Sequence, residues 1–186
     1  MDARHRSRQR VAAALVTACV LTSIAAISPS RGAAGAPLHV GAPAPALVVP
    51  LLNGRTFDLA SERGKVVIVN FWATWCSPCR AEMPRLDAFY KRYHGRGVEL
   101  LGLSVDDASD RAAVADIMGH FSYPAALAAS ARANDFGEPP AVPMTWIIDT
   151  HGVVRARLVA GSAVTEQTLE QAVTPLLGTQ KARAGQ

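Results

Sequence analysis

The sequence predicts an α/β domain in which a central mixed β-sheet is flanked by helices and preceded by a β-hairpin extension. Two mainly apolar segments, at 66–72 and 98–105, are typical of buried parallel strands. Apolar residues at helical spacing follow the first run, and two further strands and a helix complete the order. A chain of 186 residues has room for one such domain with a sizeable core.

The first 36 residues are arranged like an export segment. They carry five arginines against one aspartate, and residues 11–27 form an uncharged apolar stretch. The small residues at 34–36 resemble a cleavage site, which predicts a cleaved signal peptide. A retained membrane anchor is the alternative, because 17 residues lie at the lower limit for crossing a bilayer. Lipid attachment at Cys19 is a third possibility, and all three predict a domain exported to a periplasmic compartment.

The charge distribution argues against a nucleic acid partner. The formal net charge is +4, and the excess lies in the export segment, because the rest of the chain has equal numbers of acidic and basic side chains. Residues 37–45, rich in Pro, Ala and Gly, are predicted to be a linker. The folded domain is expected over 46–178 and a flexible tail over 179–186.

The predicted elements follow the hydrophobic pattern along the chain. Apolar segments at 47–49 and 56–59 flank Asn53-Gly54, a strong signal for a β-hairpin. The pattern then predicts a helix from the cysteine pair to about 93, a strand at 98–105, a helix at 110–120, a short strand at 123–128, a short helix at 129–136, strands at 145–149 and 153–159, and a helix at 165–177.

The cysteines of Cys76-Ser77-Pro78-Cys79 lie where the first buried strand gives way to a helix. A cysteine at a helix N-terminus meets unpaired N–H groups that favour its thiolate, so Cys76 is predicted to attack and Cys79 to resolve the mixed disulfide. A zinc site of four cysteines is excluded, because the chain has three. Covalent haem attachment would need a histidine where Arg80 stands. An inert structural disulfide remains an alternative.

The sequence Phe71-Trp-Ala-Thr-Trp-Cys-Ser-Pro-Cys-Arg-Ala-Glu-Met-Pro84 resembles the active-site signature of the thioredoxin superfamily, and within it the TlpA/ResA type. The resemblance implies a thioredoxin-like fold and an exported thiol-disulfide oxidoreductase that reduces disulfides of partner proteins. It also implies a membrane partner that supplies electrons, and targets in cytochrome c maturation or cytochrome oxidase copper-site assembly. It implies no cofactor and no metal ion.

The same resemblance extends to a second part of the site. Val142-Pro143, just before the strand at 145–149, looks like the cis-proline that lies opposite the cysteine pair in this superfamily. A proline there lacks an N–H group, so the backbone of Val142 is expected to pair with an extended substrate. Trp75 precedes the attacking cysteine and is expected to line the rim that receives a partner's disulfide.

Proton transfer is predicted to differ from that in thioredoxin. Thioredoxin has a buried aspartate and a lysine at positions that look like Asn70 and Gly102 here. Glu82 lies about one helical turn after Cys79, and a glutamate also occurs at this point in TlpA/ResA-like proteins. A partly buried carboxyl would have a raised pKa and would accept the Cys79 proton, whereas a solvated glutamate would have no such role.

Two functions other than thiol-disulfide exchange are compatible with a reactive cysteine pair. A peroxidase of the same superfamily would have its reactive cysteine in a Pro-x-x-x-Thr-x-x-Cys setting, which the chain lacks. A Cu(I) carrier would use Cys76 and Cys79 as soft ligands, and this is the main alternative. The Ser77-Pro78 insert has no histidine to stabilise a thiolate, so the cysteine couple is expected to act as a reductant.

Overall fold

A computed structural model describes residues 38–159 and 164–177. The predicted export segment and the predicted C-terminal tail lie outside these residues. The strands are β1 (Leu47–Pro50), β2 (Thr56–Asp58), β3 (Val66–Trp72), β4 (Val98–Ser104), β5 (Ala125–Leu127), β6 (Ala133–Asn134), β7 (Met144–Ile148) and β8 (Val154–Val159). The α-helices are α1 (Ser77–Tyr93), α2 (Arg111–Met118) and α3 (Glu166–Leu177), and short 3-10 turns lie at Leu59–Glu62, His94–Arg96, Ala108–Asp110 and Ala128–Ser130.

Five strands form the central mixed sheet in the order β5-β4-β3-β7-β8. Strands β3, β4 and β5 run parallel, whereas β7 and β8 are antiparallel to their neighbours. Every residue of β3 and β4 is buried, as the two apolar runs predicted. The parallel pairing places the C-terminal ends of β3 and β4 at the same edge of the sheet.

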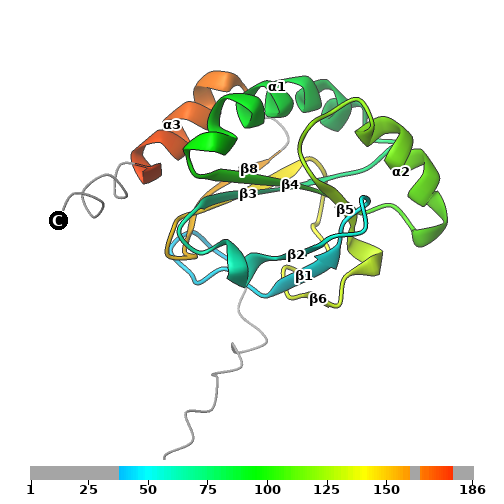
Figure 1. Ribbon diagram of the computed structural model, residues 1–186, viewed down its shortest axis with the longest axis horizontal. Helices are drawn as coiled ribbons and strands as arrows, with labels where there is room; N and C mark the ends of the chain where they lie inside the picture. The colour runs from blue at the N-terminus through cyan, green and yellow to red at the C-terminus, as the bar shows by residue number, and fades with distance from the viewer. Residues whose placement is uncertain (1–37, 160–163, 178–186) are drawn as a thin grey trace, which may run out of the picture. The chain divides into compact units, whose positions relative to one another are not determined.

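The two faces of the sheet have different covers (Figure 1). Helices α1, α2 and α3 lie over one face, and β1, β2 and β6 lie over the other. Fully buried Leu86 and Phe89 of α1 and Leu169 of α3 belong to the core under the helices. The second core joins Val49 and Phe57 of the hairpin to the opposite face of the sheet. Because residues alternate between faces along a strand, β3 supplies side chains to both cores.

The predicted hairpin extension is confirmed. Strand β1 pairs antiparallel with β2, and the turn between them includes Gly54, which has a positive φ of 85°. Strand β6 pairs with the other edge of β1, so that the three strands form a small separate sheet.

One predicted element is wrong. The alanine-rich segment 129–136 was expected to form a short helix, but it contains the end of a 3-10 turn followed by β6. Backbone hydrogen bonds from Arg132 to Val48 and from Asp135 to Ala46 bind this segment to β1. Pairing with an exposed strand edge satisfies these backbone groups, and this tertiary contact overrides the helical propensity of the alanines.

The segment before β1 runs beside the turn that joins β7 to β8. The Gly41 N–H donates to the Val154 carbonyl and the Ala44 N–H donates to the Gly152 carbonyl, and both hydrogen bonds are 2.8 Å long. None of the helices within 38–159 and 164–177 combines the length and the apolar character needed to cross a membrane.

Candidate active site

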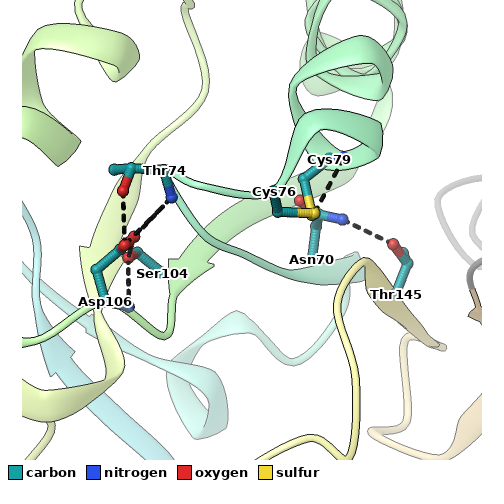
Figure 2. Close-up of a disulfide and its surroundings, with 7 residues drawn as sticks. All are labelled: Asn70, Thr74, Cys76, Cys79, Ser104, Asp106 and Thr145. Atoms are coloured by element: carbon teal, nitrogen blue, oxygen red, sulfur yellow. Dashed lines mark hydrogen bonds between the residues drawn. A yellow bond between two sulfur atoms is a disulfide. The ribbon is translucent and has the colours of Figure 1, made fainter.

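Cys76 and Cys79 form a disulfide at the beginning of α1 (Figure 2). Cys76 is the N-cap residue of the helix, and its Sγ accepts a hydrogen bond of 3.2 Å from the Cys79 N–H group. Pro78 occupies the first turn, where the missing N–H group has no consequence for the helix. The first-turn N–H groups and the helix dipole would therefore stabilise a thiolate on Cys76 after reduction.

Asn70 lies on β3, the strand that leads into the cysteine loop. Its side chain is buried, and its Nδ2 donates a hydrogen bond of 2.9 Å to Thr145 Oγ1 on β7. Gly102 is the partner of Asn70 in the register between β3 and β4. A Cβ atom at position 102 would lie 3.0 Å from the Tyr123 ring and 3.3 Å from Trp72 Nε1, so a larger residue there would require these side chains to shift. The two paired positions therefore carry neither an acid nor a base.

Glu82 is buried, with 9% of its surface exposed, on the turn of α1 that follows Cys79. Burial raises the pKa of this carboxyl group above its usual value, while a hydrogen bond from the Val164 N–H and the nearby Arg85 act in the opposite direction. One carboxyl oxygen, Oε2, has no hydrogen-bond partner among the described residues. The predicted burial of Glu82 is observed, and it shifts the pKa of the carboxyl group upward.

The Val142–Pro143 peptide bond is cis, as the sequence predicted. The register between β3 and β7 pairs Phe71 with Met144, so Pro143 lies at the edge where β3 leads into the cysteine loop. Val142 is partly buried and packs against both cores. The structure therefore brings the two parts of the predicted site to the same edge of the sheet.

The two tryptophans of the signature differ sharply in exposure. Trp72 is completely buried at the end of β3, whereas Trp75 is 71% exposed immediately before Cys76. An exposed indole next to a reactive cysteine offers a large apolar surface to a partner protein. The disulfide itself is almost completely covered, with 4% of Cys76 and 2% of Cys79 exposed.

A buried aspartate that no sequence motif marks holds the cysteine loop. Asp106, two residues beyond β4, accepts hydrogen bonds from the Thr74 N–H and Oγ1 groups and from Ser104 Oγ (Figure 2). The contact depends on strand register, which local sequence does not show: Trp72 pairs with Ser104, so β3 and β4 end side by side.

A pocket of about 630 Å³ lies between the first turns of α1 and the end of α2. It is lined by Ser77, Arg80, Ala81, Met83, Asp116, Ile117, His120 and Phe121. Ser77 belongs to the insert between the cysteines, so this pocket borders the site. Within the described residues, no group of three or more His, Cys, Asp or Glu side chains is placed to hold a metal ion.

Comparisons with known proteins agree with this geometry. A family model described as the AhpC/TSA family matches residues 40–157. The thiol-disulfide oxidoreductase ResA of Bacillus anthracis is 33% identical over 137 residues, which span 72% of this chain and 75% of that protein. ResA of Bacillus subtilis (strain 168) is 32% identical over 124 residues, which span 66% of this chain and 68% of that protein.

Solved structures share the fold. A thioredoxin-family thiol:disulfide interchange protein from Chlorobium tepidum TLS superposes with a TM-score of 0.64 and 28% identity, over 76% of this chain and 99% of that one. A secreted thiol-disulfide isomerase from Corynebacterium glutamicum has a TM-score of 0.63 at 24% identity, over 81% and 96% of the two chains. The chain therefore belongs to the AhpC/TSA family, has the thioredoxin-like fold, and is a thiol-disulfide oxidoreductase related to ResA.

Proposed function

We propose that this protein is an exported reductase that transfers two electrons from Cys76 and Cys79 to disulfides of partner proteins. The observation that carries the proposal is the cysteine pair at the N-terminus of α1, at the sheet edge that also holds the cis-proline. This arrangement combines a stabilised thiolate with a neighbouring backbone that can hold a substrate strand.

The first step is attack on the partner. The Cys76 thiolate forms a bond to one sulfur of the partner's disulfide, and the other partner sulfur leaves as a thiolate. Trp75 and the backbone of Val142 are the proposed binding groups, because Trp75 is exposed beside Cys76 and Val142 precedes the cis-proline. The product is a mixed disulfide between Cys76 and the partner.

The second step is resolution by Cys79. Its thiol gives up a proton, its sulfur bonds to Cys76 Sγ, and the second partner sulfur leaves as a thiolate. We propose that Glu82 accepts that proton. The residue is buried one helical turn after Cys79, and its raised pKa brings it closer to the pKa of a thiol. The partner is then reduced, and the enzyme holds the disulfide drawn in Figure 2.

The oxidised enzyme needs two electrons before it can act again. We propose a membrane-bound thiol-reducing protein as the donor, with the export segment at 1–36 directing the domain to the compartment outside the cytoplasm. Residues 11–27 would tether the protein if the segment is retained. The proposed target classes are disulfides formed between apocytochrome c thiols and disulfides of copper-site assembly proteins of cytochrome oxidase.

Single-turnover reduction of insulin by the prereduced domain, beginning at Pro37, tests the activity. The wild-type protein should reduce insulin and end in the disulfide form. Cys79→Ser should accumulate a mixed disulfide that is visible on a nonreducing gel, because the attacking sulfur remains and the resolving sulfur does not. Cys76→Ser should accumulate none. A mixed disulfide at Cys79 in the Cys76→Ser variant would show that Cys79 can attack, and it would contradict the role proposed for Cys76.

The same preparation separates reduction from copper transport. A Cu(I) carrier would bind one Cu(I) at high affinity through the two thiols and would leave insulin oxidised. Rapid reduction of insulin by the metal-free protein would argue against that alternative.

A further inference from the structure

The loop between β3 and α1 is held by a buried carboxylate that lies outside the signature. Asp106 is 4% exposed, and its two oxygens accept bonds of 2.9 and 3.2 Å from the Thr74 N–H, 2.7 Å from Thr74 Oγ1 and 2.6 Å from Ser104 Oγ. The Asp106 N–H group in turn donates a hydrogen bond of 3.0 Å to Ser104 Oγ. Three donor groups thus bond to the two carboxyl oxygens, so this side chain attaches the loop to the end of β4.

The attachment acts on the residues that meet the partner. Thr74 lies between fully buried Trp72 and exposed Trp75, and Cys76 follows Trp75. A bond of 2.9 Å from the Val105 N–H to the Trp72 carbonyl holds the start of the loop, and one of 3.1 Å from the Cys76 N–H to the Ala73 carbonyl closes its turn. Asp106 fixes the middle of this short loop from the neighbouring strand. A change in the backbone conformation of Thr74 would therefore displace both Trp75 and Cys76.

We propose that Asp106 is a positioning residue for thiol-disulfide exchange, which acts through Thr74 to orient Cys76 and Trp75 toward a protein disulfide. The inference rests on the proposed reductase function and adds a residue to its machinery. Attack on a disulfide requires the thiolate to approach along a defined direction, and small displacements of a reacting group reduce rates strongly. Asp106 is not proposed to exchange a proton or to touch the substrate.

Two substitutions test this network at different depths. In the wild type the Thr74 N–H contacts both carboxyl oxygens of Asp106. Asp106→Asn replaces one of these acceptors with an amide nitrogen, which is a donor, so one of the two contacts is lost. Thr74→Val removes only the hydroxyl donor and keeps the N–H and the approximate volume, so it gives a milder disturbance. Asp149→Asn is the matched control. Asp149 is also a buried aspartate that accepts two backbone N–H groups, but it lies in the turn between β7 and β8, at the opposite end of β7 from the cis-proline.

The measurements are single-turnover insulin reduction and alkylation of Cys76 by iodoacetamide as a function of pH, both well below the melting temperature. We expect the second-order rate for insulin to fall about tenfold in Asp106→Asn and about threefold in Thr74→Val. Alkylation at high pH, where the thiolate is fully formed, should stay within about twofold of wild type, because a small reagent needs no docking. Asp149→Asn should match the wild type in both measurements.

A double variant tests whether Asp106 acts through Thr74. If it does, Thr74→Val combined with Asp106→Asn should be no slower with insulin than Asp106→Asn alone, since coupled residues do not add. Equal insulin rates for Asp106→Asn and Asp149→Asn would overturn the proposal. Alkylation slowed as much as insulin reduction would also overturn it, because intrinsic thiolate reactivity would then be the cause. Failure of the wild-type protein to reduce insulin would instead refute the reductase function itself.

Discussion

At the scale of single residues, the burial of Glu82 disfavours its charged form but places its carboxyl group near Cys79. Burial disfavours its charged form, and Oε2 has no hydrogen-bond partner among the described residues. The same burial places a carboxyl group with a raised pKa one helical turn from Cys79. Two predictions follow from these facts, one for the rate of resolution and one for stability.

Glu82→Gln should slow resolution of the mixed disulfide and leave the first attack unchanged. The amide cannot accept a proton, and loss of a general base commonly reduces a rate by about a hundredfold, so we expect at least a tenfold effect. Wild-type resolution should rise with pH as the carboxyl group ionises, above the usual range for glutamate, and the variant should lack this rise. Stopped-flow Trp fluorescence with a preformed mixed disulfide measures the step. Glu138→Gln, at an exposed glutamate, is the control, and identical profiles for the wild type and Glu82→Gln would exclude proton transfer to Glu82.

The same substitution should change stability in a pH-dependent way. The folded state holds the Glu82 proton more tightly than the unfolded chain, because burial raises the pKa in the folded state. The folded state therefore binds more protons within the window between the two pKa values, and the free energy of unfolding falls as pH rises through it. Glu82→Gln avoids this loss, so its urea midpoint should exceed that of the wild type at pH 8.

At about pH 4 most unfolded molecules of the wild type are also protonated at Glu82, so the difference between the two midpoints should be smaller there than at pH 8. Urea titrations at pH 4 and pH 8 provide the comparison. An advantage for Glu82→Gln that is larger at pH 4 than at pH 8 would contradict the assigned direction of the pKa shift.

The signature residues could be predicted from local sequence, whereas the network that holds them could not. The predicted strand and helix, together with the resemblance to the thioredoxin superfamily, were sufficient to locate the cysteines, Glu82 and Pro143 in the sequence. Asp106 is 32 residues from Thr74, and it comes close only through the parallel pairing of β3 and β4. A single aspartate after a strand does not reveal what it holds.

At the scale of elements, α3 supports the site from the side of the helices. Val164, just before α3, donates a backbone hydrogen bond to Glu82. Fully buried Leu169 and Val173 attach α3 to the core that includes both cysteines. The packing of this helix and the environment of Glu82 should therefore be linked.

Leu169→Ala should lower the free energy of unfolding by about 2–5 kcal/mol, because it leaves a cavity in a fully buried position. It should also change the pH profile of resolution, since a loosened α3 exposes Glu82 to water and reduces the upward shift of its pKa. Arg92→Ala is the control, because Arg92 joins α1 to Glu166 and Glu170 of α3 over 2.6 and 2.8 Å at the exposed surface. Its urea midpoint should be close to that of the wild type, as expected for exposed ion pairs. Equal losses for the two variants would contradict a role for apolar packing.

Element prediction succeeded where the hydrophobic pattern was strong. The long apolar runs of β3 and β4 and the Asn53-Gly54 turn are local signals, and all three are borne out. The segment 129–136 was assigned wrongly because its structure depends on the free edge of β1, about 85 residues earlier in the chain and invisible to any local pattern.

At the scale of the whole molecule, both faces of the central sheet are packed against other elements, and the reactive groups lie at one edge of the sheet. Helices cover one face and the small sheet of β1, β2 and β6 covers the other, so the reactive groups gather at the edge where β3 ends and β7 begins. Both faces are therefore occupied by packing, which leaves this edge to receive a partner. What the edge does in the cell depends on the direction in which electrons flow.

The reduction potential of the Cys76/Cys79 couple should lie near or below about −230 mV, in the range of reductants. The Ser77-Pro78 insert contains no histidine, so the dithiol form gains little stabilisation beyond that of the helix N-terminus. Thiol trapping across dithiothreitol and glutathione buffers measures the value. Pro78→His is the matched variant, and a positive charge beside the thiolate should raise its potential above that of the wild type. A wild-type value near about −120 mV would make the protein an oxidant of its partners and would contradict the proposed direction. Absence of any reversible two-electron couple would favour copper binding at the same thiols.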